Sequence, residues 1–141
     1  MSPDRLVGYA LIAVPIFLSM TLHEYGHARM ALAFGDRTAL LMGRVTINPL
    51  AHLDLLGTIC LFFGPIGWAK PVPVNPMNLE PKRLGDVCVS LAGIGMNLLL
   101  AGVALGGIHL LAATGVRIDR DPNGPVTAAG IAVLLLTLLL Y

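Results

Sequence analysis

The sequence predicts an all-α membrane protein with about four transmembrane or re-entrant helical segments, joined by short extended segments at the membrane surface. Of its 141 residues 56% are hydrophobic and 12% are charged, and the mean hydropathy is +0.81. A soluble domain carries about 25% charged residues. The apolar residues also form long runs separated by short polar or proline-rich connections. Because the chain has no internal repeat and no low-complexity segment, we treat residues 1–141 as a single integral-membrane domain.

The first apolar run predicts one long helix from about Leu6 to Phe34, ended by Gly35 and Asp36. Its length is sufficient to cross a hydrocarbon core of about 30 Å. Pro15 is expected to kink this helix. No small-residue cleavage site follows the run, so we interpret it as a retained span and not as a signal peptide.

The middle of the chain alternates connections with further apolar segments. Residues 35–50 form a connection in which Val45-Thr46-Ile47 has strand propensity, so we expect a short extended piece there. Residues 51–67 follow as a short apolar segment, tilted, kinked at Gly64-Pro65 or partly re-entrant. A third span is expected from about Leu84 to Ala113, then a polar loop over 114–125 and a fourth apolar segment over Val126–Tyr141.

Residues 67–76 form an unusual connection, because Pro71, Pro73 and Pro76 forbid a helix and favour an extended backbone. One interpretation is an edge to which an unwound substrate strand could hydrogen-bond. The other is a rigid interfacial connector, with Trp68 at the headgroup level and Lys70 among the lipid phosphates.

The first predicted helix contains a motif that indicates metal chemistry: His23-Glu24-Tyr25-Gly26-His27. Four residues of helix advance roughly 400°, so the two imidazoles stand on one face about one turn apart, as two ligands of one zinc ion require. In the helical His-Glu-x-x-His motif the glutamate takes a proton from the zinc-bound water. The motif predicts His23 and His27 as metal ligands and Glu24 as the catalytic base.

Other interpretations of the motif, and of Gly26 and Asn97, stay open. The motif side chains could hydrogen-bond only one another, although ionisable groups in a bilayer-length apolar segment are costly and usually functional. Gly26 could let a backbone approach the metal or could serve simple helix packing. Asn97, in the third span, is either a hydrogen-bonding contact between helices or a donor aimed at the site.

Charge and cysteine content exclude several classes of function. The net charge of +1 and the absence of basic tails give no support for a nucleic-acid partner. Cys60 and Cys88 lie in apolar stretches without metal-ligand spacing, so we expect small buried thiols. Basic residues divide evenly between the two expected sides of the membrane and do not settle its orientation.

Taken together, these segments resemble the site-2 protease family of intramembrane zinc metalloproteases, in its short prokaryotic form. The resemblance rests on the His-Glu motif, the Gly43–Leu56 segment with its Asn-Pro and His-Leu-Asp elements, the Gly67–Pro76 segment, and Gly93 to Asn97. It implies a role for Asn97 in orienting substrate or stabilising charge. The family takes its third zinc ligand from a later Leu-Asp-Gly element, which does not occur here, and Asp54 is not assigned that role. We therefore expect a C-terminally incomplete protease.

The resemblance implies a Zn²⁺-dependent endopeptidase that hydrolyses peptide bonds in or near the transmembrane segments of membrane-protein substrates. The expected location is a prokaryotic cell membrane, with a multi-pass chain in the lipid bilayer. One alternative is a catalytically inactive pseudoprotease that binds membrane proteins. Another is a small transporter with a proton relay, although the chain lacks the paired repeats that many transporters show. The sequence leaves the substrate and the oligomeric state open.

Overall fold

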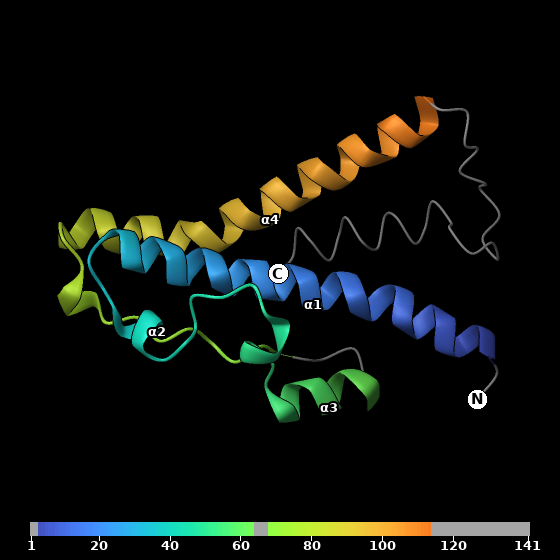
Figure 1. Cartoon of the computed structure of the whole chain (residues 1–141), viewed down its shortest axis with the longest axis horizontal. Helices are drawn as coiled ribbons and strands as arrows, with labels where there is room; N and C mark the ends of the chain where they lie inside the picture. Colours follow the sequence, from blue (N-terminus) through green and yellow to red (C-terminus); the bar gives the residue numbers. More distant parts are fainter. Residues whose placement is uncertain (1–2, 64–67, 114–141) are drawn as a thin grey trace. The chain divides into compact units, whose positions relative to one another are not determined.

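The computed structural model describes residues 3–63 and 68–113, and the regular elements within them are helices joined by loops (Figure 1). Its elements in chain order are α1 (Pro3–Ala33), α2 (Thr38–Leu41), η1 (Pro49–Ala51), α3 (Leu55–Phe63), η2 (Pro76–Asn78) and α4 (Lys82–Ala113). Contacts divide the chain into two compact units, one of residues 20–96 and one of residues 1–19 with 97–141. The candidate site lies in the first of these, and the single-domain interpretation stays a prediction.

Helix α1 confirms the long N-terminal helix predicted from the apolar run, and it continues through Pro15. Its end is set by Gly35, whose φ of 99° is readily adopted only by glycine. Gly35 N–H donates to the Leu32 carbonyl at 3.2 Å, and Asp36 N–H donates to the Ala31 carbonyl at 2.9 Å. This pair of bonds is a Schellman motif, and it fixes the position of Asp36 against the last turn of α1.

The first connection contains a short helix, α2, that the sequence did not predict. It ends as α1 does, with Gly43 at φ 67° and the Arg44 N–H donating to the Ala39 carbonyl at 2.8 Å. The chain then bends at residues 45–46 and forms no strand there. Buried His52 donates from Nε2 to the Thr46 carbonyl at 2.8 Å, which closes this connection into a compact loop.

Helix α3 is shorter than the predicted apolar segment over 51–67, and residues 64–67, with the expected kink, lie outside the described residues. Asp54 accepts a hydrogen bond from Gly57 N–H at 2.9 Å at the start of α3. Residues 68–75, called the extended segment below, have the non-helical conformation that their prolines predict. An antiparallel bridge between Ala69 and Leu53 and a 2.8 Å bond from Lys70 N–H to the His52 carbonyl attach the extended segment to the loop.

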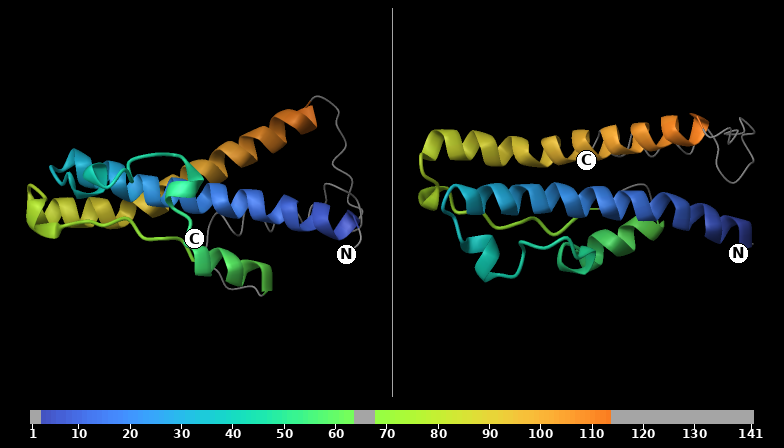
Figure 2. Two further views of the ribbon diagram at one scale, coloured as in Figure 1. Left: turned by 60° about the horizontal axis from the view of Figure 1, so that its bottom comes forward. Right: turned by 45° about the horizontal axis from the view of Figure 1, so that its top comes forward.

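Helix α4 confirms the helix predicted over residues 84–113. Among the described residues, Lys82–Gly107 is the stretch long and apolar enough to cross a membrane, judged by length and composition. Within residues 20–96, the end of α1 lies along the start of α4 (Figure 2). A small core of Ala31, Leu79 and Val89 forms between them. The predicted loop over 114–125 and the fourth apolar segment lie outside the described residues, so a multi-pass arrangement stays a prediction.

Candidate metal centre

The two histidines of the motif converge, as their helical spacing predicts. His23 Nε2 and His27 Nε2 lie 3.0 Å apart, with the rings edge to face and their centroids 4.7 Å apart. Two imidazole nitrogens on one tetrahedral zinc, each at about 2.0–2.1 Å from the metal, lie about 3.3 Å apart. The separation is close to that of two ligands of one metal, and it is also that of a hydrogen bond between the two rings, the other interpretation of the motif.

The tautomer of His27 is set by α4. His27 Nδ1 lies 2.7 Å from the Val89 carbonyl oxygen, and because a carbonyl can only accept, Nδ1 carries the proton and donates. The lone pair of neutral His27 is then on Nε2, the atom that faces His23. A backbone carbonyl on the far nitrogen is the partner that metal-binding histidines usually have. This contact connects the motif on α1 to a helix 62 residues further along the chain.

Gly93 on α4 provides the space that the two rings occupy. A Cβ atom built at Gly93 would lie 2.4 Å from His23 Nε2 and 2.5 Å from His27 Nε2. One turn away, a Cβ at Gly26 would lie 2.9 Å from the Ala92 carbonyl oxygen. Gly26 is thus in contact with α4, which matches the helix-packing alternative for this residue. Two glycines bring the helices close enough for the imidazoles to share one small space.

Glu24 faces a different partner, the extended segment. Its Oε2 accepts a hydrogen bond from the backbone N–H of Val72 at 2.8 Å. Pro71 and Pro73 on either side have no N–H, so Val72 carries the one donor of this tripeptide. The bond orients the Glu24 carboxylate toward the extended segment.

Asp36 is a buried carboxylate that the sequence reading treated only as the end of a helix. It is fully buried, and it accepts hydrogen bonds from Thr38 N–H (3.1 Å), Thr38 Oγ1 (2.5 Å), Asn78 Nδ2 (3.0 Å) and Asn75 N–H (2.7 Å). Burial raises its pKa, but the bonds from Thr38, Asn78 and Asn75 outweigh this effect and lower the pKa to about 2. A short polar residue just after a glycine cap was the signal available in the sequence.

The geometry of the histidine pair fits zinc: two imidazoles have facing Nε2 atoms, His27 is held through its other nitrogen, and a Cβ at Gly93 would fill the space beside them. Catalytic zinc takes three protein ligands. Within residues 3–63 and 68–113 no group of three His, Cys, Asp or Glu side chains is placed to hold a metal. The pair could supply two of the three protein ligands that such a zinc needs.

The remaining polar residues of the resemblance have contacts away from the histidine pair. Asp54 accepts from Gly57 N–H at the start of α3, and His52 donates within its loop. Asn97 is buried in the unit formed by residues 1–19 and 97–141, where its Oδ1 accepts a 3.4 Å hydrogen bond from Ser19 Oγ. This hydrogen bond joins α1 and α4, and a role of Asn97 toward substrate stays a prediction.

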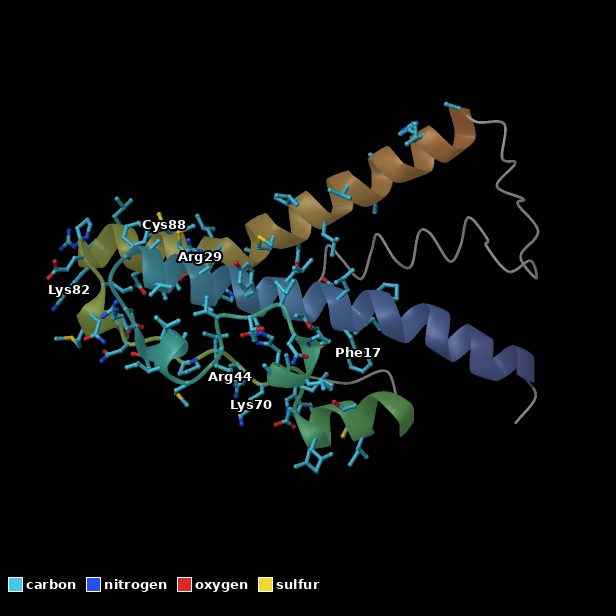
Figure 3. The ribbon with its side chains drawn as sticks, viewed as in Figure 1. Phe17, Arg29, Arg44, Lys70, Lys82 and Cys88 are labelled. Atoms are coloured by element: carbon cyan, nitrogen blue, oxygen red, sulfur yellow. The ribbon has the colours of Figure 1, made fainter. Side chains whose placement is uncertain are left out.

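Most of the charged side chains within residues 20–96 lie on loops and near helix ends (Figure 3). Lys82 is at the start of α4, whereas Arg44 and Lys70 belong to the loops beside α2 and α3 (Figure 3). Cys60 and Cys88 are free thiols, but both are only partly buried and not fully buried as expected.

Comparison with known proteins finds relatives named as zinc metalloproteases. The chain is 41% identical over 119 residues to "Putative zinc metalloprotease YwhC" of Bacillus subtilis (strain 168), covering 81% of this chain and 54% of the relative. It is 35% identical over 141 residues to "Putative zinc metalloprotease Rip2" of Mycolicibacterium smegmatis, covering 94% and 50%. Rip2 of Mycobacterium tuberculosis H37Rv is 36% identical over 132 residues, covering 89% and 47%.

The chain spans about half the length of the curated relatives it matches. No family model matches it. No solved structure matches it. The similarities relate the chain to zinc metalloproteases, and this relationship agrees with the donor chemistry of His23 and His27.

Proposed function

We propose that this protein is a zinc metalloendopeptidase of the site-2 protease type, which hydrolyses peptide bonds in or near the transmembrane segments of substrate proteins. The observation that carries the proposal is the histidine pair, with Nε2 atoms 3.0 Å apart and Nδ1 of His27 donating to a backbone carbonyl. Glu24, beside the pair, supplies the third element of the motif.

His23 and His27 hold the metal in this proposal, and the third ligand comes from a part of the protein outside the described residues. When bound, zinc makes a water molecule acidic enough to react at neutral pH and polarises the peptide carbonyl. Gly93 keeps the space beside both rings open. The Val89 carbonyl holds His27 in the tautomer that can bind metal.

Glu24 acts as the general base and then as the general acid. Its Oε2 is anchored by the Val72 N–H, and Oε1 has no hydrogen bond within the described part of the chain. Oε1 accepts the proton of the attacking water and returns it to the leaving amine. Because a helical amide is hydrogen-bonded and shielded, the substrate must unwind locally, and small or helix-breaking residues are expected near the cut. By resemblance, Asn97 orients the substrate.

The test is zinc content and cleavage in the purified full-length protein, reconstituted with a designed single-span substrate whose Leu-Ala helix is interrupted by Gly-Ser. We expect about one zinc per chain, and loss of zinc and cleavage in His23→Ala and His27→Ala. Glu24→Gln should keep zinc and lose at least about a hundredfold in kcat, since positioned acid-base catalysis contributes about 10²–10⁴-fold.

The matched control is His109→Ala, which removes an exposed histidine from the distant part of α4 and should change neither quantity. Full cleavage by Glu24→Gln would remove Glu24 from the mechanism. A wild-type protein without zinc, whose membrane partners are captured equally well by His23→Ala, would instead favour the catalytically inactive binding module.

A further inference from the structure

Two carboxylates attach the extended segment to the α1 region, and the proposed mechanism uses only one of them. Glu24 accepts from Val72 N–H at 2.8 Å, and Asp36 accepts from Asn75 N–H at 2.7 Å. The two donors are three residues apart in the extended segment. The two acceptors lie on the helix that carries the histidines and at the cap that ends it.

The position of Asp36 is itself fixed from several directions. The Gly35 cap holds its backbone to Ala31, and its side chain also accepts from Thr38 and from the Asn78 amide. The carboxylate is fully buried, so it cannot exchange these donors for water without exposing the cap. Asp36 is therefore a fixed point against which the extended segment is aligned.

The register of the extended segment along α1 matters because prolines flank Val72. If the extended segment slipped by one residue along α1, Pro71 or Pro73 would lie opposite Glu24, and neither has an N–H to donate. Glu24 would then lose its donor although every residue of the motif was intact. On the other side of Val72, the bond between Lys70 N–H and the His52 carbonyl attaches the segment to its loop and not to α1.

We propose that Asp36 is a positioning residue for Glu24: by holding Asn75 it fixes the register in which the extended segment presents the Val72 N–H to the Glu24 carboxylate. This inference rests on the proposed role of Glu24 as the general base. Asp36 touches neither substrate nor metal, and it acts through the segment between residues 72 and 75.

The first test is Asp36→Asn in the full-length protein. The amide nitrogen of asparagine donates where Asp36 accepts, so it opposes one of the four donors while nearly preserving side-chain volume. The fold should persist, because Glu80 N–H still donates to the Phe34 carbonyl and Leu79 stays in the core. Asp54→Asn is the matched control, since Asp54 also accepts a backbone N–H, but from Gly57 at the start of α3 and not from the extended segment.

Amide hydrogen exchange and enzyme kinetics measure the effect of Asp36→Asn. We expect the Val72 amide to lose protection at least about tenfold in Asp36→Asn, while the amides of α1 and α4 and the zinc content stay as in the wild type. The kcat should fall about tenfold or more with KM little changed, since an oriented catalytic group is lost and substrate binding is not. Unchanged Val72 protection in Asp36→Asn would overturn the proposal.

A double-mutant cycle with Val72→Pro separates positioning from general damage. Val72→Pro removes the N–H while Asp36 remains, so it should lower kcat as Asp36→Asn does. If Asp36 acts through this N–H, the double variant is no slower than the slower single variant. Losses in kcat that multiply would assign Asp36 a purely structural role and reject the proposal.

Failure of the inference is distinguishable from failure of the proposed function. If the wild type neither binds zinc nor cleaves the designed substrate, the proposed function fails. Hydrogen exchange of the Val72 amide in Asp36→Asn still tests whether Asp36 fixes the register of the extended segment. If the wild type is an active zinc enzyme and Asp36→Asn matches Asp54→Asn in kcat, only the inference fails.

Discussion

The two sides of the candidate site are built differently. His23 and His27 are held by helix packing: one helix spaces them, a second supplies the Val89 carbonyl, and Gly93 leaves them room. Glu24 is held by a hydrogen bond from a segment that has neither helix nor strand. In the proposed site, the metal-binding side therefore depends on shape, and the acid-base side depends on the register of an irregular backbone.

Substitutions on the two sides should therefore have different effects. Steric changes between the helices should remove the metal and leave the extended segment in place. Changes at the anchors of the extended segment should leave the metal and impair the base. A set of variants that separates zinc content from turnover can test whether the two sides are independent.

The largest effect is expected at Gly93. In Gly93→Ala the new Cβ would meet the Nε2 atoms of His23 and His27 at 2.4–2.5 Å, and because these atoms end flexible side chains, the rings rotate away while the helices stay packed. We expect zinc content to fall from about one per chain to near zero, with loss of cleavage and little change in thermal stability. Gly95→Ala is the control, since its Cβ would meet nothing within 4 Å. Normal zinc content in Gly93→Ala would show that the rings do not depend on this space.

An intermediate effect is expected at Gly57, which packs against the extended segment. A Cβ there would lie 2.2 Å from the Trp68 carbonyl oxygen, and a backbone atom cannot rotate away. Gly57→Ala should separate α3 from the extended segment and lower the free energy of unfolding by about 1–3 kcal/mol, with zinc retained. Thermal unfolding and zinc analysis measure this, and Leu56→Ala, at an exposed neighbouring position, is the control. Loss of zinc in Gly57→Ala would mean that the two sides are coupled.

The smallest effect is a pH dependence of stability that comes from Asp36. Its pKa in the folded protein is lowered from 3.8 to about 2, so the ionised form stabilises the fold above pH 4. As the pH falls from about 4 to about 2 this contribution is lost, at most about 2 kcal/mol. Denaturant unfolding between pH 5 and pH 2 measures it, and Asp36→Asn should flatten that part of the profile. A wild-type profile no steeper than that of Asp36→Asn would contradict the assignment.

Much of the helical framework could be predicted from local patterns. The apolar runs gave α1 and α4 to within a few residues, and Gly35 marked the end of the first. The spacing of His23 and His27 required their convergence once that helix was assigned, since four residues make about one turn. Helix α2 was missed because four residues leave no periodic pattern to recognise.

The contacts of the site with distant segments could not be predicted. The sequence had already suggested that residues 67–76 are extended, but nothing local pairs Val72 with Glu24, 48 residues away. Asp36 followed a glycine cap, and no local pattern indicates that its carboxylate gathers Asn75 and Asn78. Such hydrogen bonds depend on how the chain returns to α1.

By itself, the sequence determined the apolar helical class, the spacing of the two imidazoles and the adjacent carboxylate, because helix periodicity and hydrophobicity are local properties of the chain. The tertiary structure alone decided which nitrogen of His27 faces its partner, which glycine makes room for the rings, and which backbone donor holds Glu24. The reason is physical: each of these contacts joins residues tens of positions apart, and their meeting is set by packing and not by local conformational preference.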